Sequence, residues 1–504
     1  MPGTVDFRSR YADWKAPKAE ADHLLWPSAG GVVSDAFANS RRLSEIESLR
    51  IQNTPLSGLR AEARSNLGVA ADQLLIATGH QVEMYHPGVW VKNVLIDAVA
   101  QKAGGRAIHF AVDTDTPKHL QLRWPGGAVL MSDDAAIVDG AWSALVRRPS
   151  ANHLNKIKTL FDQESTSWHF RPLLADHWHA LDAKSDATDD SLVQSVLNLA
   201  NSIDDNLGLR VGRDLLSKRI AETPFLAFAH HLAADAARVA EHYNRALADY
   251  RTAEGITTAA RPMPDLMLKP QRVELPFWLD DLQTQERIRA VVIKTPDGWW
   301  LDAEEPFLFD PKRSAAAAAA SLLKYLSEQN LRLAPRALTL TMYFRLLVVD
   351  QFIHGIGGGR YDQVTDRLIE TYWGIAAPAF SVSTLTLRFP GANPPDSACV
   401  PCLMNQGHRL KHNLSGSQKQ AHLAAIAAAP RNSMQRRAHF LAMHRALASA
   451  VDTTNAVPAW RAKLEQAIAD DARYAVLRDR ELFYGIQPRE RLLAVIDQFA
   501  AAFA

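Results

Sequence analysis

Residues 73–115 read QLLIATGHQVEMYHPGVWVKNVLIDAVAQKAGGRAIHFAVDTD, and two apolar segments flank a helical one in this stretch. The first apolar segment, residues 73–78, predicts a buried strand that stops at Gly79. A loop should follow, then a helix that ends at Gly104–Gly105, then a second strand. Strand, helix and strand within about 45 residues predict a βαβ unit, which requires a parallel sheet.

A second α/β passage lies further along the chain. It should contain a helix from Arg336, a strand near residues 348–354, a glycine loop, a helix over 362–372 and a closing strand at 379–387. Between the two passages, residues 150–260 have helical spacing of apolar side chains, whereas 272–309 contain short β-type runs typical of an antiparallel meander.

These patterns predict a mixed α/β protein with a Rossmann-like parallel sheet as its core. A helical insertion, a small antiparallel β meander and a helical C-terminal region should accompany that core. The expected domains are 1–140 and 311–390 for the two halves of the core, 141–262 for the insertion, 263–310 for the meander, and 391–504 for a Cys/His segment and the C-terminal helices.

The composition restricts the possible partners and the compartment. The 504-residue chain has 56 basic and 55 acidic side chains, so no long-range field of one sign is available to hold a nucleic acid or an anionic membrane. No stretch approaches the roughly 18 apolar residues needed to span a bilayer. The first residues contain no apolar signal core, and two cysteines cannot form a disulfide framework. We therefore expect a cytoplasmic protein that binds neither nucleic acid nor membrane.

The loop between the first strand and its helix is the first candidate site, because ligands of parallel sheets bind beyond the carboxyl ends of the strands. Gly79 permits close backbone approach, and Gln81 can orient a ligand. His80 and His86 can transfer protons near neutral pH. Lys92 lies in the opening turn of the helix, where a cation opposes the helix dipole unless an anion is bound. The alternative is a polar loop with Lys92 reaching solvent.

The end of the second strand, FAVDTDTPKH, is the second candidate. Asp113, Asp115 and His119 could bind a hydroxylated substrate, act as acid or base, or hold a hydrated magnesium ion. The alternative is that the aspartates and threonines cap the following segment.

The third candidate is HGIGGGRYD at residues 354–362. Three consecutive glycines, Gly357, Gly358 and Gly359, predict a backbone-lined ligand pocket, to which Asp362 should also contribute. Arg360 could bind a phosphate or a carboxylate through two hydrogen bonds. A plain flexible turn is the alternative.

The fourth candidate contains both cysteines of the chain, with the spacing Cys399-x2-Cys402-x5-His408-x3-His412. Four ligands of these types suit tetrahedral zinc. The alternatives are an ordinary loop with two small thiols and a redox pair.

The order of these pieces resembles the bacillithiol-biosynthesis family of cysteine-adding enzymes. The T-G-Q-Q signature of that family is similar to residues 78–81, with His80 in place of a glutamine, and its acidic G-E-D-H-D cluster is similar to Asp113–His119. Its arginine-led helix, strand and G-P-G-E loop are similar to Arg336–Asp362, where Arg360-Tyr361 replaces a glutamate. Over about residues 70–390 the resemblance implies a Rossmann-like core, a bound nucleotide and a reaction that joins cysteine to a glucosamine–malate conjugate.

Two functional hypotheses follow. The first is an enzyme for group transfer or amide-forming ligation that acts on a small anionic or nucleotide-like ligand. Here His80 or His86 would move the proton, Lys92 and Arg360 would hold the anion, and Asp115 would orient an amine or a metal. The second is a non-catalytic scaffold with a structural zinc clip and a homo-oligomer interface on the C-terminal helices. The enzyme hypothesis requires the two glycine-containing loops to converge.

Overall fold

The computed structural model of the chain describes residues 14–117, 120–133, 142–182, 191–258, 260–391, 399–413, 416–452 and 456–504. The chain divides into two units. Unit 1 combines Met1–Leu387 with Arg480–Ala504, and unit 2 is Arg388–Asp479. Within the described ranges, no helix is both long enough and apolar enough to cross a membrane.

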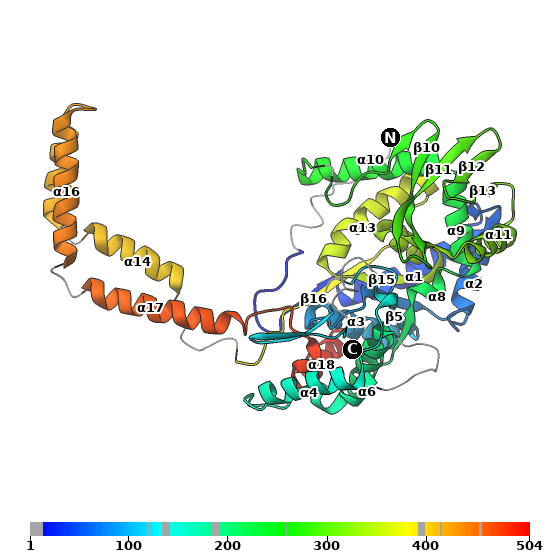
Figure 1. The fold of residues 1–504 in the computed structure, drawn as a ribbon, viewed down its shortest axis with the longest axis horizontal. Coiled ribbons are helices and arrows are strands. Elements are labelled where there is room, and N and C mark those ends of the chain that lie inside the picture. The colour runs from blue at the N-terminus through cyan, green and yellow to red at the C-terminus, as the bar shows by residue number, and fades with distance from the viewer. Residues whose placement is uncertain are drawn as a thin grey trace. The chain divides into compact units, whose positions relative to one another are not determined.

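Unit 1 contains a six-stranded mixed sheet in which five strands are parallel (Figure 1). In spatial order the strands are β1 (His23–Trp26), β16 (Ser381–Leu385), β15 (Gln351–His354), β4 (Leu75–Gln81), β5 (Arg106–Val112) and β8 (Val211–Leu215). Only β1 is antiparallel to its neighbour. Numbered along the chain, the five parallel strands lie in the order 3-2-1-4-5, so the order reverses between β4 and β15. The predicted parallel sheet is therefore confirmed.

The βαβ unit forms where the sequence predicts it. Helix α3 (Pro87–Ala103) connects β4 to β5, and it begins after His86, whose Nδ1 accepts the N–H of Gly88 at 3.0 Å. Proline at the first helical position and Gly104 in the left-handed conformation (φ 63°) set the two ends of this helix. Strand β4 is longer than predicted, so Gly79 belongs to the strand rather than to the loop.

A second, antiparallel sheet confirms the predicted meander and extends it (Figure 1). Its strands are β13 (Phe307–Phe309), β12 (Gly298–Leu301), β11 (Arg287–Thr295), β10 (Arg272–Asp281) and β14 (Leu331–Pro335), with β9 (Leu268–Lys269) beside β10. Alternate apolar residues of β10 are buried, from Val273 to Leu279, and the strand packs against α10 (Ala236–Glu254) and, through Phe277 and Phe225, against α9 (Thr223–Ala234), whose other neighbour is the alanine-rich α11 (Ala315–Glu328). Strand β14 follows α11, so the sheet extends beyond the predicted range.

The remaining helices and hairpins of unit 1 surround these sheets. The helices are α1 (Ala29–Glu45), α2 (Leu56–Ser65), α4 (Ala151–Ser165), α5 (Leu173–His177), α6 (His179–Asp182), α7 (Leu192–Asn206), α8 (Leu216–Arg219), α10 (Ala236–Glu254), α12 (Ala337–Tyr343), α13 (Ile356–Leu368) and α18 (Arg489–Phe503). The hairpins pair β2 (Arg50–Ile51) with β3 (Thr54–Pro55) and β6 (Gln121–Trp124) with β7 (Gly127–Leu130).

The elements described in unit 2 are helices joined by turns. Helix α15 (Gly416–Ala428) pairs with α16 (Met434–Asp452), and α14 (Val400–Asn413) pairs with α17 (Ala456–Ala475). The indole N–H of Trp460 on α17 donates to the carbonyl of Leu403 on α14 at 2.7 Å. The Cys/His segment, expected ahead of the C-terminal helices, is therefore itself helical from Val400 onward, with Cys399 directly before α14.

Candidate functional site

A cavity of about 220 Å³ lies at the carboxyl edge of the parallel sheet. Because β4 and β15 are adjacent and parallel, with Ile353 opposite Thr78, the chain leaves both strands at the same edge. Gly79 and Gln81 of β4 and His354 of β15 line the cavity, together with Asp115, which follows β5. The cavity therefore lies where the strand order reverses, which is the usual ligand position in open parallel sheets.

The opposite wall is provided by the antiparallel sheet and by the start of α12. Trp278 of β10, Arg287 of β11 and Arg336, the residue before α12, line this wall. Both guanidinium groups lie over the Trp278 ring, at 5.7 Å and 5.2 Å from its centroid. Such cation–π contacts hold long side chains in defined positions.

Each arginine of this wall is paired with a buried carboxylate. Arg287 binds Asp280 through two hydrogen bonds of 2.6 and 3.0 Å, and Arg336 Nη1 binds Glu274 at 2.6 Å. Among the described residues Arg336 makes no other side-chain hydrogen bond, so its Nε and Nη2 can serve a ligand. A guanidinium group with two adjacent N–H donors matches a carboxylate or a phosphate.

The acidic group of the cavity is Asp115. Gln81 Nε2 donates to its carboxylate at 2.6 Å, and Arg287 Nη1 lies 3.6 Å from it. The side chain of Asp115 is 48% exposed, so it keeps acceptor positions for an incoming cation or amine. The structure thus joins two residues that the sequence analysis assigned to separate candidate sites.

His354 was not singled out from the sequence, yet it lines the cavity. A contact with Asp362 holds its ring in place. Its Nε2 lies 3.0 Å from Asp362, whose carboxylate also accepts from Arg345 at 2.6 Å. Although burial opposes the charge of Asp362, Arg345 and His354 hold the pKa of this carboxyl well below its usual range. Asp362 is therefore an ionised acceptor, and it holds the His354 ring in place through Nε2. Asp362 orients a side chain of the cavity rather than touching a ligand.

Lys92 lies beneath the site rather than in it. Lys92 is 3% exposed, and its Nζ donates to the carbonyl of Gly79 at 3.0 Å. Burial lowers the pKa of Lys92 to about 7, and the nearby carboxylate of Glu83 opposes this shift without overcoming it. The prediction that Lys92 binds an external anion is not supported by this position, because the side chain points into the protein core.

Three further predicted residues make contacts inside the fold. His80 Nδ1 lies 3.4 Å from Glu83, and His86 caps α3 and lies 3.8 Å from Glu481. Asp113 accepts the backbone N–H of Ser217 at 2.9 Å, and burial raises its pKa. None of the three lines the cavity. His119 lies outside the described residues.

The predicted glycine loop is the opening of helix α13. Gly357, Gly358 and Gly359 lie in its first turns, and none of them lines the cavity. Gly359 is required for packing, because an added Cβ would lie 2.5 Å from a methyl group of Val382. The guanidinium of Arg360 donates to the carbonyl of Trp14 at 2.8 Å and does not reach the cavity. The loop after β4 and the glycine segment after β15 therefore lie at the same edge of the sheet, but Arg360 does not contribute to the cavity there.

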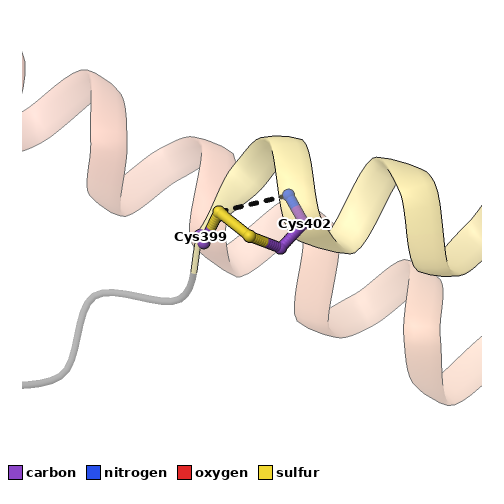
Figure 2. Close-up of a disulfide and its surroundings, with 2 residues drawn as sticks. All are labelled: Cys399 and Cys402. Carbon is purple, nitrogen blue, oxygen red and sulfur yellow. Dashed lines mark hydrogen bonds between the residues drawn. A yellow bond between two sulfur atoms is a disulfide. The ribbon is translucent and has the colours of Figure 1, made fainter.

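The expected zinc site is not assembled in the described residues. Cys399 and Cys402 form a disulfide (Figure 2), so neither sulfur is present as a thiolate ligand. Among the residues described, no three His, Cys, Asp or Glu side chains come together as a metal site. His408 and His412 lie two to three turns further along α14, and the side chain of His412 is not among those described.

A larger hollow, of about 490 Å³, lies at the other edge of the sheet and includes Arg60 and Arg64. These two guanidinium groups bind Asp350 at 2.5 and 2.9 Å and also donate to backbone carbonyls. Asp350 in turn accepts the N–H of Leu75 at 2.7 Å. The two arginines and Asp350 therefore hold the starts of β4 and β15 together. This hollow is the weaker candidate for a ligand-binding site.

Comparison of the chain with protein-family models and with curated proteins finds no match. The site must therefore be interpreted from its own chemistry. It combines one carboxylate, one arginine with available donors, one oriented histidine and an aromatic wall.

Proposed function

We propose that unit 1 is an enzyme that binds a small amino-carboxylate, such as an α-amino acid, and uses it in a ligation or group-transfer reaction. The observation that carries this proposal is that Asp115, Arg336 and His354 line one small cavity at the carboxyl edge of the parallel sheet. Their charges are complementary to a ligand with an ammonium group at one end and a carboxylate at the other.

The recognition follows from the donors and acceptors of the cavity. Nε and Nη2 of Arg336 would hold the carboxylate of the ligand, since a guanidinium can donate two parallel hydrogen bonds. Asp115, fixed by Gln81, would accept hydrogen bonds from the ammonium group. Trp278 and Phe344 supply apolar surface for a short side chain. A volume of about 220 Å³ lies below the roughly 300–1,000 Å³ of sites for larger ligands, which favours an amino acid over a whole nucleotide.

The proton-transfer role falls to His354 rather than to His80 or His86. Asp362 holds the His354 ring through Nε2, and this ring is the group of the cavity that would accept a proton from the ammonium group of the ligand. A deprotonated amine is the nucleophile that an amide-forming ligation requires. Asp362 acts through His354 and is a positioning residue.

The reaction class rests on the resemblance to cysteine-adding enzymes together with this ligand chemistry. The strand order 3-2-1-4-5 supports a Rossmann-like core, because doubly wound nucleotide-binding folds have this order. A nucleotide co-substrate would have to extend outward from the cavity. Cysteine is the amino acid that the resemblance favours.

Thermal-shift measurements with matched ligand pairs test this proposal. Each pair contains an amino acid and the same molecule without its amine, for example alanine and propionate, or cysteine and 3-mercaptopropionate. The amino acid should raise the melting temperature more than its partner does, because binding to the native state stabilises it. Losing a hydrogen bond to a charged group weakens binding by about tenfold to a hundredfold, so Asp115→Asn should remove the preference for the amine.

A matched control keeps the interpretation clear. Asp297→Asn makes the same change at an exposed turn between β11 and β12, so the preference should survive in this variant. If no amino acid shifts the wild-type melting temperature, or if Asp115→Asn retains the preference, the proposed ligand class is wrong.

A further inference from the structure

The two cysteines of the chain lie at the start of α14 in unit 2, where they form a disulfide (Figure 2). The backbone N–H of Cys402 points at Cys399 Sγ, with 3.2 Å between nitrogen and sulfur. Both side chains are exposed to solvent. Cys399 therefore occupies the position of an N-terminal cap, and its sulfur accepts a hydrogen bond from the first turn of the helix.

The surroundings of this disulfide favour a negative charge on sulfur. The N-terminus of a helix carries a partial positive charge, and the first turn of α14 holds no acidic residue. Arg409 and Lys411 are the Lys and Arg residues of α14, which contains no Asp or Glu, and the nearest acidic residue along the sequence is Asp396. Thiols at helix N-termini, near cations and in Cys-x-x-Cys pairs are the ones that ionise most readily.

A purely structural role does not account for the bond. The sequence separation of the two cysteines is three, so the closed loop is contained within one helical turn. The constraint that a disulfide places on the unfolded chain grows with loop length, and this loop is very short. The bond also joins no two elements of unit 2, which are held together by contacts such as that between Trp460 and Leu403.

We propose that Cys399 and Cys402 form a redox-active pair that exchanges disulfides with low-molecular-weight thiols. This function does not depend on the cavity of unit 1. In the reduced pair, the Cys399 thiolate attacks an external disulfide RSSR and forms a mixed disulfide, releasing RS⁻, which takes up the proton that Cys399 lost. The Cys402 thiol then loses its proton, attacks Cys399 and releases the second RSH. Two electrons and two protons pass from the pair to RSSR, giving two RSH, and the reverse reaction regenerates the dithiol.

Single-cysteine variants test the asymmetry between the two sulfurs. Because the chain has no other cysteine, Cys402→Ser reports Cys399 alone and Cys399→Ser reports Cys402 alone. Alkylation rates with iodoacetamide, measured from pH 5 to 10, give the titration midpoint of each thiol. We expect the midpoint of Cys399 to lie at least about one pH unit below that of Cys402, which corresponds to about tenfold more thiolate at pH 6.

The unmodified full-length chain supplies a second measurement. It is equilibrated with mixtures of reduced and oxidised glutathione, and its free thiols are then blocked by alkylation. Mass spectrometry counts the alkylated thiols of each chain. The pair should pass reversibly between no free thiols and two as the ratio of the two glutathione forms changes. Coinciding titration midpoints near the ordinary thiol value, or a disulfide that stays closed at every ratio, would overturn the proposal.

Discussion

Replacing Lys92 with methionine should change how the stability of the chain depends on pH. In the structure Lys92 is 3% exposed, and burial lowers the pKa of its ammonium group from the ordinary 10.5 to about 7. Methionine has a similar length and no charge, so the variant removes the titrating group while filling most of the same space. The carbonyl of Gly79 loses its hydrogen bond in the variant, but this loss does not depend on pH.

The sign follows from the protons bound in each state. Between pH 7 and 10.5 the unfolded chain keeps the Lys92 proton while the folded chain has lost it, so the free energy of unfolding rises with pH over this window. Below pH 7 both states are protonated and the cost of burying the charge is fully present. Because one pKa unit corresponds to about 1.4 kcal/mol, wild type should gain about 2 kcal/mol over Lys92→Met between pH 7 and pH 9.

Urea unfolding followed by tryptophan fluorescence at half-unit steps from pH 6 to pH 9 measures this difference. Contributions from other titrating groups cancel when the variant is subtracted from wild type. If the two stability curves run parallel from pH 7 to pH 9, Lys92 titrates normally and the burial argument fails.

Two pairs of substitutions, each a test with its control, probe the packing behind the site. Gly359→Ala should destabilise the protein by about 1–3 kcal/mol, because the new methyl group overlaps Val382, whereas Gly357→Ala, with nothing within 4 Å, should be neutral or stabilising by up to about 1 kcal/mol. Arg345→Leu should cost about 3–5 kcal/mol, since it leaves the buried Asp362 and the half-buried Asp366 without their guanidinium partner. The exposed pair of Lys324 is the control, and Lys324→Leu should cost less than about 0.5 kcal/mol. Chemical denaturation measures all four, and equal costs within either pair would refute the corresponding argument.

The parallel sheet could be predicted because β4, α3 and β5 carry local signals. Each strand is a short apolar run, and the helix ends at a glycine that adopts positive φ. The edge strand β1 has only four half-buried residues and depends on pairing with β16, more than 350 positions away. Pairing over such separations leaves no periodic trace in a single sequence.

The site was only partly predictable for the same reason. Gln81 and Asp115 follow strands and could be identified from that position, but their partners Arg287 and Arg336 come from a different sheet and helix. Charged residues within the apolar strand RVELPFWLDD were an available signal, because a buried carboxylate such as Asp280 requires a cationic partner. The burial of Lys92 was not predictable, because a lysine near a helix start is usually exposed and its burial here is a tertiary effect.

A crystal structure of the chain with the amino acid that gives the largest thermal shift would test the proposed site. We predict ligand density in the 220 Å³ cavity, with the ammonium group on Asp115 and the carboxylate on Arg336. The same crystals would show the His354 ring beside the ligand amine. Density in the hollow beside Arg60 and Arg64 instead, with the cavity empty, would contradict the proposal.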